Sequence, residues 1–201
     1  MRKLLIATTN RGKIKEIEKL LKEDLTGVTL YSLADLNIEI DCPENGATFY
    51  ENAADKAIFY SKLAPGIYTA ADDSGLVVEA LQGEPGVYSA RYAGAECDDE
   101  KNIEKLLKEM SGEKNKTAKF VTVIVIALDG EVIDSFAGEA AGIILPERRG
   151  SKGFGYDPVF YYPPLERTFA QLSTGEKNEV SHRAMALRKL KSFLADGIRS
   201  L

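Results

Sequence analysis

Two adjacent carboxylates lie in the short polar segment Asp72-Asp73-Ser74-Gly75. Apolar runs at Ile67–Ala71 and Leu76–Ala80 flank it, so the pattern predicts a strand, a turn and a second strand. Carboxylates at strand ends can hold a divalent cation and deprotonate a water molecule. A plain turn is the alternative, because turns favour Asp, Ser and Gly. Successive strand residues point to opposite faces, so we expect Asp72 and Asp73 to act differently.

The segment Thr8-Thr9-Asn10-Arg11-Gly12-Lys13 follows a predicted buried strand and precedes a stretch with helical spacing of apolar residues. Backbone N–H groups at the start of a helix attract anions, and the Arg and Lys side chains add positive charge. The segment is not a Walker A loop, because Ala7 replaces its first glycine and Ile14 replaces its Ser or Thr. Phosphate binding and an ordinary strand-to-helix turn both remain open.

The capping-box pattern Thr48-Phe49-Tyr50-Glu51 predicts the start of a helix that ends near Pro65. On a helical wheel Lys56 lies about 20° from Phe49, on the apolar side. A lysine that points to the buried side needs a partner charge or must reach water along the helix edge. Glu44, just upstream, is a possible carboxylate at the start of the same helix.

The glycine-rich segment Gly153-Phe154-Gly155-Tyr156-Asp157-Pro158 does not match the dinucleotide fingerprint, because Pro158 occupies the third glycine position. An aromatic residue flanked by glycines can stack on a flat base, and a nearby Asp can accept a hydrogen bond from it. An aromatic side chain that anchors a long loop to the core is the alternative.

Lys177 and Ser181-His182-Arg183 bring cations to the predicted start of the last helix. Cations are unfavourable at that end of a helix unless an anion or a carbonyl-rich ligand meets them. Glu176 and Glu179 could neutralise them instead.

The elements that would position these residues alternate between strands and helices. Phe120–Leu128 and Val132–Phe136 are predicted to form a hairpin around Asp129-Gly130. An amphipathic helix is expected from Asp98 onward. The interleaved order favours an α/β fold with a mixed sheet.

Composition excludes several classes of function. The chain of 201 residues has one His and two Cys, too few for common zinc sites unless all are used, so we expect a hard cation with Mg²⁺ as the default. The 26 Lys and Arg against 31 Asp and Glu give a net charge of −5, which argues against general nucleic-acid binding. No apolar run is long enough for a signal peptide or a membrane span, and the two cysteines suit a reducing, cytoplasmic location.

Seven segments with these features occur in a fixed order along the chain: Thr8–Lys13, Thr48–Ala53, Ala71–Leu76, Pro85–Tyr92, Gly153–Asp157, Glu176–Asn178 and Ser181–Arg183. In this order they closely resemble the non-canonical purine nucleoside triphosphate pyrophosphatases, also called inosine triphosphate or XTP/dITP pyrophosphatases. The resemblance spans Thr8 to Arg183, and Tyr156 stands where some members carry tryptophan.

The resemblance implies one domain over residues 1–201, an elongated mixed-sheet α/β fold with two lobes around a central substrate groove, and a homodimer. It implies Mg²⁺-dependent hydrolysis of ITP, dITP or XTP to the monophosphate and pyrophosphate. Glu44 and Asp73 would place Mg²⁺, and Asp73 would be the general base. The implied contacts to the phosphates are Thr8, Thr9, Asn10, Arg11, Gly12, Lys13 and Lys56. Ser74 would contact the substrate beside Asp73. The residues implied to surround the nucleotide are Phe154, Gly155, Tyr156, Asp157, Lys177, His182 and Arg183.

Two alternatives differ in chemistry. A Maf-like pyrophosphatase would act on modified pyrimidines, but Ser181–Arg183 and Gly153–Asp157 argue against it. A nucleotide-binding regulator would not hydrolyse its ligand, whereas the presence of both Glu44 and Asp73 favours catalysis.

Overall fold

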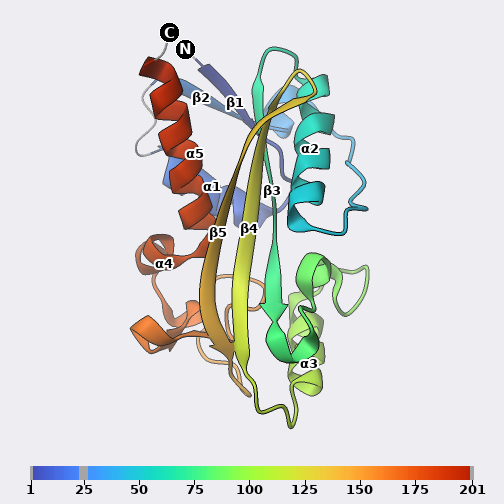
Figure 1. Cartoon of the computed structure of the whole chain (residues 1–201), viewed down its shortest axis with the longest axis vertical. Coiled ribbons are helices and arrows are strands. Elements are labelled where there is room, and N and C mark those ends of the chain that lie inside the picture. Colours follow the sequence, from blue (N-terminus) through green and yellow to red (C-terminus); the bar gives the residue numbers. More distant parts are fainter. Residues whose placement is uncertain (1, 23–26, 200–201) are drawn as a thin grey trace. The chain divides into compact units, whose positions relative to one another are not determined.

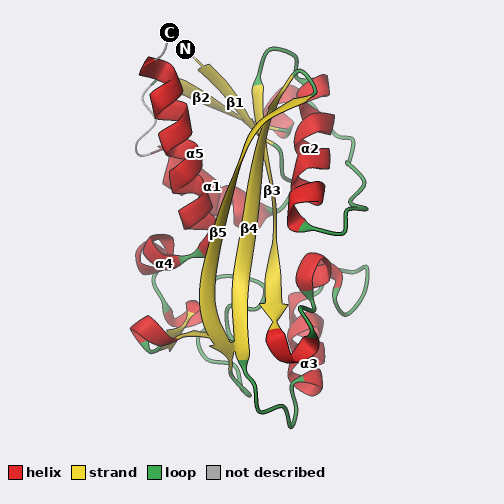
Figure 2. Ribbon diagram, in the orientation of Figure 1, coloured by secondary structure: helices red, strands yellow, loops and turns green. Residues whose placement is uncertain are grey.

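The computed structural model describes residues 2–22 and 27–199, in which helices and strands alternate (Figures 1 and 2). The strands are β1 (Arg2–Ile6), β2 (Val28–Ser32), β3 (Tyr68–Val78), β4 (Thr117–Leu128), β5 (Glu131–Ile144), β6 (Phe160–Tyr162) and β7 (Arg167–Thr168). The α-helices are α1 (Arg11–Lys22), α2 (Phe49–Leu63), α3 (Asp99–Glu109), α4 (Thr174–Val180) and α5 (His182–Arg199). Short 3₁₀ helices include η3 (Gly86–Arg91).

Within the described residues, seven strands form one mixed sheet in the order β2-β1-β3-β4-β5-β6-β7. β1 pairs in parallel with β2 and β3, with Leu4 opposite Leu30 and Tyr68. β6 pairs antiparallel with β5 and β7. The predicted α/β class is therefore confirmed.

The chain divides into two compact units. The first unit comprises Met1–Asp73, Thr122–Ala137 and Ala184–Leu201, and the second comprises Ser74–Val121 and Gly138–Arg183. β3, β4 and β5 each contribute residues to both units. That the whole chain is one domain, with a substrate groove between two lobes, stays a prediction.

The first unit buries both faces of its part of the sheet, because its strand residues alternate between two apolar clusters. On β4, Ile124 and Ile126 pack with α1 and α5, whereas Val125 and Ala127 pack with α2. Each face buries aliphatic side chains, and each fully buried Leu or Ile contributes about 1.5–3 kcal/mol. This alternation puts neighbouring residues of β3 into two different environments.

The second unit has one main apolar cluster, in which α3 packs on β3, β4 and β5 residues. Phe120, Phe160 and Phe169 form its aromatic centre, with ring centroids 4.6–5.8 Å apart. Residues 148–159 before β6 contain no helix or strand. Among the described residues, no helix combines the length and apolar character needed to cross a membrane.

Two local predictions had different outcomes. The hairpin is confirmed: Asp129 and Gly130 connect β4 to β5 and both have positive φ, 50° and 88°, as a tight hairpin turn requires. The turn predicted at Asp72–Gly75 is wrong, because β3 runs without interruption through these residues. Within this strand, each of the two aspartates meets a cation on its own face of the sheet.

Candidate active site

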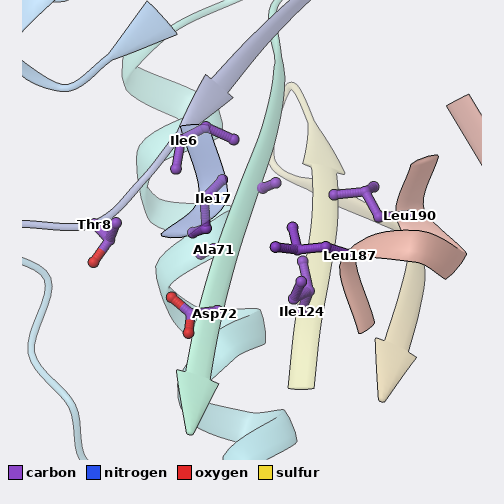
Figure 3. Close-up of a pocket in the computed structure, with 9 residues that line it drawn as sticks. Ile6, Thr8, Ile17, Ala71, Asp72, Ile124, Leu187 and Leu190 are labelled. Atoms are coloured by element: carbon purple, nitrogen blue, oxygen red, sulfur yellow. The ribbon is translucent and has the colours of Figure 1, made fainter. Parts of the chain in front are cut away.

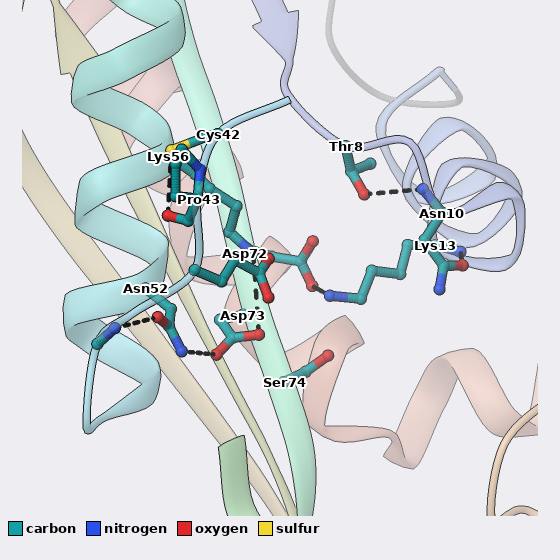
Figure 4. A network of polar contacts seen from close by, with 12 residues as sticks. Thr8, Asn10, Lys13, Cys42, Pro43, Asn52, Lys56, Asp72, Asp73 and Ser74 are labelled. Carbon is teal, nitrogen blue, oxygen red and sulfur yellow. Dashed lines mark hydrogen bonds and ion pairs between the residues drawn. The ribbon is translucent and has the colours of Figure 1, made fainter. Parts of the chain in front are cut away.

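β3 presents Asp72 and Asp73 on opposite faces of the sheet (Figure 4). Asp72 lies on the α1 side, where it meets Lys13, and Asp73 lies on the α2 side, where it meets Asn52. Both are buried, with 3% and 7% of their surface exposed. The two carboxylates therefore have different surroundings, and their different roles stay a prediction.

On the α2 side, two carboxylates from separate segments approach one ammonium group. Lys56 Nζ lies 2.7 Å from Glu44 Oε1 and 3.8 Å from Asp73 Oδ1. α2 directs Lys56 to this point because the capping box predicted at Thr48 and Glu51 is formed and fixes the start of the helix. The predicted partner charge for the lysine is thus Glu44, with Asp73 close by.

Burial and charge act in opposite directions on these groups. Burial raises the pKa of Asp73 above its ordinary value, although Lys56, Lys13 and a hydrogen bond from Asn52 oppose the rise. Burial alone would lower the pKa of Lys56. The negative charges of nearby carboxylates, of which Asp73 has the largest effect, outweigh burial and raise this pKa above its ordinary value. The site therefore keeps Lys56 charged and makes Asp73 a stronger proton acceptor than an ordinary aspartate.

On the α1 side, Lys13 Nζ lies 3.0 Å from Asp72 Oδ2, with only 13% of the lysine side chain exposed. A cavity of about 10 Å³ adjoins this carboxylate, and its other walls are apolar apart from Thr8 (Figure 3). That volume holds about one water molecule. The cavity is therefore too small to hold a nucleotide.

Asn10 caps the start of α1. Its Oδ1 accepts hydrogen bonds from the N–H groups of Gly12 and Lys13, at 2.9 and 3.1 Å, and its own N–H donates to Thr8 Oγ1. Two of the N–H groups predicted to bind anions thus already have an acceptor. Thr9 is exposed, and the side chain of Arg11 lies outside the described residues.

In the second unit, a buried ion pair organises the glycine-rich segment. Lys177 Nζ lies 2.6 Å from Asp157 Oδ2, and their side chains are 8% and 2% exposed. The same Asp157 oxygen accepts the N–H of Phe154 at 3.1 Å. Lys177 Nζ is 5.1 Å from the centre of the Phe154 ring. The structure thus groups three of the residues predicted to surround a nucleotide.

Arg183 and His182, in the first turn of α5, also lie in this region. Arg183 Nη2 donates to Ser74 Oγ at 2.8 Å, and its guanidinium carbon is 5.7 Å from the centre of the Phe154 ring. The His182 ring stacks on Phe120, with centroids 4.7 Å apart and planes 10° apart. Both side chains are almost fully buried, at 2% and 4% exposure.

Tyr156 and Gly155 are tied to other parts of the second unit. The buried Tyr156 donates its hydroxyl to the Ser89 carbonyl at 2.8 Å, and burial raises its pKa. The N–H of Gly155 donates to Asp99 Oδ2 at 2.7 Å. Tyr156 therefore anchors the segment to η3, whereas a direct contact with substrate stays a prediction.

The residues present fit a magnesium ion bound together with a substrate. Among the described residues, no group of three His, Cys, Asp or Glu side chains is arranged to hold a metal. Mg²⁺ is commonly held by only one or two carboxylates, with water and substrate phosphates completing its shell. Glu44 and Asp73 supply such a pair, with oxygens 2.7 and 3.8 Å from Lys56 Nζ.

Three residues that contact this machinery were not assigned a role from the sequence. Asn52 donates to Asp73, Asp99 accepts from Gly155, and Ser89 accepts from Tyr156. Asn52 has a local signal, since it precedes Lys56 by one helical turn on α2. Asp99 and Ser89 act across long stretches of chain, and no local pattern indicates their contacts.

Comparison with known proteins places these features in one family. The model of the Ham1 family matches residues 4–193. The dITP/XTP pyrophosphatase of Desulfotalea psychrophila is 46% identical over 189 residues, covering 94% of this chain and 83% of that protein. The Bacillus subtilis protein of the same name is 43% identical over 196 residues, covering 96% and 98%.

Solved structures agree with this comparison. The Staphylococcus aureus Ham1 protein matches with a TM-score of 0.86 and 41% identity, and a HAM1 protein from Coxiella burnetii with 0.88 and 36%. Each match covers 98% of this chain and all of the other. The family resemblance predicted from the ordered motifs is confirmed.

Proposed function

Because this chain belongs to the Ham1 family, we propose that it hydrolyses non-canonical purine nucleoside triphosphates, namely ITP, dITP and XTP, to the monophosphate and pyrophosphate. The observation that carries this proposal is the approach of Glu44 and Asp73 to Lys56 at one point on the α2 side of β3. Removal of such triphosphates cleanses the nucleotide pool.

Asp73 is the proposed general base. Its raised pKa suits it to take one proton from a water molecule, whose oxygen then bonds to the attacked phosphorus. The bond from that phosphorus to the oxygen bridging the α- and β-phosphates breaks, and the leaving group departs with the bond's electrons. Lys56, kept charged by the carboxylates around it, stabilises the negative charge that develops on the phosphate oxygens.

Glu44 and Asp73 are also the residues that would hold Mg²⁺. Bound there, Mg²⁺ would neutralise charge on the phosphate oxygens and lower the pKa of water. Lys13, held by Asp72, and the capped loop Thr8–Gly12 would contact the phosphates beside it.

We assign base recognition to the group around Phe154. The ring provides a stacking surface, and the adjacent Lys177 and Arg183 are hydrogen-bond donors. Inosine and xanthosine carry an acceptor carbonyl at the purine 6-position, whereas adenosine carries a donor amino group. A donor from Arg183 or His182 left unpaired by adenine costs about 1–3 kcal/mol, which is a preference of roughly 5- to 150-fold.

A cytoplasmic homodimer is part of the same proposal. Both cysteines are free thiols, which suits a reducing compartment. Light scattering of the purified protein tests the dimer, and a monomer at micromolar concentration would contradict it.

Pyrophosphate release tests the activity. Purified protein with Mg²⁺ is expected to release pyrophosphate from ITP, dITP and XTP faster than from ATP, GTP, dUTP or TTP, and excess EDTA should abolish release. Preference for a pyrimidine would instead favour a Maf-like specificity. Nucleotide binding without any pyrophosphate release would favour a regulator.

The variant Asp73→Asn tests the proposed role of Asp73 as general base and metal ligand. It removes the base and a metal ligand together, so turnover should fall by at least about 10³-fold while some ITP binding remains. Unchanged turnover would refute the role of Asp73. Arg183→Ala should narrow the ITP-over-ATP ratio of kcat/KM, and an unchanged ratio would place base recognition elsewhere.

A further inference from the structure

Asn52 is a fully buried polar side chain of α2 that the proposed reaction does not yet use. Its Nδ2 donates to Asp73 Oδ2 at 3.1 Å, and its Oδ1 accepts the N–H of Gly46 at 2.8 Å (Figure 4). One amide therefore contacts both the strand that carries Asp73 and the loop that carries Glu44.

The orientation of this amide is fixed by its partners. A backbone N–H can only donate, so the amide oxygen must face Gly46, and the amide nitrogen must then face the carboxylate of Asp73. Gly46 is packed too closely for any other residue, since a Cβ there would lie 2.8 Å from Asn52 Oδ1 and 2.8 Å from Glu51 Cβ. The loop thus lies directly against the first turn of α2.

The contact makes the two carboxylate oxygens of Asp73 different. Oδ2 is held by Asn52, while Oδ1 is the oxygen that faces Lys56 at 3.8 Å. The Gly46 contact fixes the backbone two residues after Glu44, whose carboxylate reaches the same ammonium group. Rotation of Asp73 about its side chain would require breaking the bond to Asn52.

We propose that Asn52 is a positioning residue that holds Asp73 and the Glu44 loop in the arrangement needed for metal binding and base catalysis. This inference rests on the proposed function for its kinetic consequence. Hydrogen-bonding partners that orient metal ligands typically change metal affinity or activity by 10- to 100-fold when they are removed. Asn52 touches neither metal nor water in this scheme and acts through the two carboxylates.

Asn52→Ala is the first test, with Ser61→Ala as the matched control. Ser61 is also a fully buried polar residue of α2, but its hydroxyl accepts the Gly130 N–H and donates to the Ile58 carbonyl, both of which are backbone groups. Asn52→Ala should lower kcat for ITP at saturating Mg²⁺ by about 10- to 100-fold and change KM by less than about threefold. Ser61→Ala should leave both within about twofold of the wild type.

A Mn²⁺ titration without nucleotide, followed by electron paramagnetic resonance, gives a second readout. Asn52→Ala should weaken Mn²⁺ binding by at least about tenfold, and Ser61→Ala should not. Unchanged kcat and Mn²⁺ affinity in Asn52→Ala would overturn the proposal, as would equal losses in both variants. If the wild type releases no pyrophosphate, the proposed function fails, whereas the Mn²⁺ titration still decides whether Asn52 positions the carboxylates.

Asn52→Asp tests the hydrogen bond that Asn52 Nδ2 donates to Asp73, and it replaces Asn52→Ala as the test if that variant does not fold. It keeps an oxygen for the Gly46 N–H but replaces the donor to Asp73 with a second carboxylate oxygen. We expect kcat to fall at least as far as in Asn52→Ala. A kcat within about twofold of the wild type would show that the bond to Asp73 is not required and would overturn the proposal.

Discussion

The buried ion pair between Lys177 and Asp157 gives a quantitative test of how the glycine-rich segment is held. Their charged atoms are 2.6 Å apart, and both side chains are less than a tenth exposed. Asp157→Asn removes one charge but keeps an oxygen that can accept the Phe154 N–H. Lys177→Met removes the other charge and keeps an unbranched apolar chain beside the aromatic rings.

Each single variant should be strongly destabilised, because it leaves one charge buried without its counter-charge. The expected loss is about 3–5 kcal/mol. Total stability is typically only about 5–15 kcal/mol. At about 2–4 °C per kcal/mol for a chain of this size, the melting temperature should fall by roughly 6–20 °C. The double variant Asp157→Asn/Lys177→Met lacks both charges of this pair, so we expect it to regain at least about 2 kcal/mol relative to the sum of the single losses.

Urea denaturation of the four proteins, followed by far-ultraviolet circular dichroism, measures this coupling; the chain has no tryptophan for a fluorescence signal. Single losses that add within about 0.5 kcal/mol would refute the argument, because independent sites add in this way. The double variant should also regain stability without regaining ITP turnover. Recovery of both would show that the pair supports only the fold and not recognition of the nucleotide.

Three further changes test single contacts. Gly153→Ala should cost at least about 1–3 kcal/mol in urea denaturation, since its Cβ would lie 1.9 Å from a carboxylate oxygen of the ion pair above, at a φ of 79°. The Arg167 guanidinium lowers the pKa of Glu176 to about 2, so the stability lost in Glu176→Gln should be constant above about pH 5 and should shrink as the pH falls toward 2; a pH-independent difference would contradict this. Asp99→Ala frees the N–H of Gly155 and should lower the ITP-over-ATP ratio of kcat/KM about fivefold, the equivalent of about 1 kcal/mol; an unchanged ratio would show that this bond does not shape recognition.

Local signals in the sequence predicted the elements that depend on neighbouring residues. The capping box at Thr48 and the turn at Asp129-Gly130 involve residues at most three positions apart, and both are formed. The turn predicted at Asp72–Gly75 failed because local composition favours a turn, while the partners that stabilise the strand come from distant segments. The contact of Asp99 with Gly155 spans 56 residues and leaves no local pattern.

The charges on the two faces of β3 explain why adjacent aspartates can serve different purposes. On the α1 face, Asp72 and Lys13 form a pair without net charge, so Lys13 brings hydrogen-bond donors rather than an excess positive charge. On the α2 face, the carboxylates of Glu44 and Asp73 meet one ammonium group, which leaves one negative charge in excess. In the proposed function, a divalent cation held by these two carboxylates would change the net charge there to one positive, which would attract a triphosphate. On this ground we propose the Asp73 face rather than the Asp72 face for metal-dependent phosphate chemistry, although neither residue type nor spacing distinguishes the two aspartates.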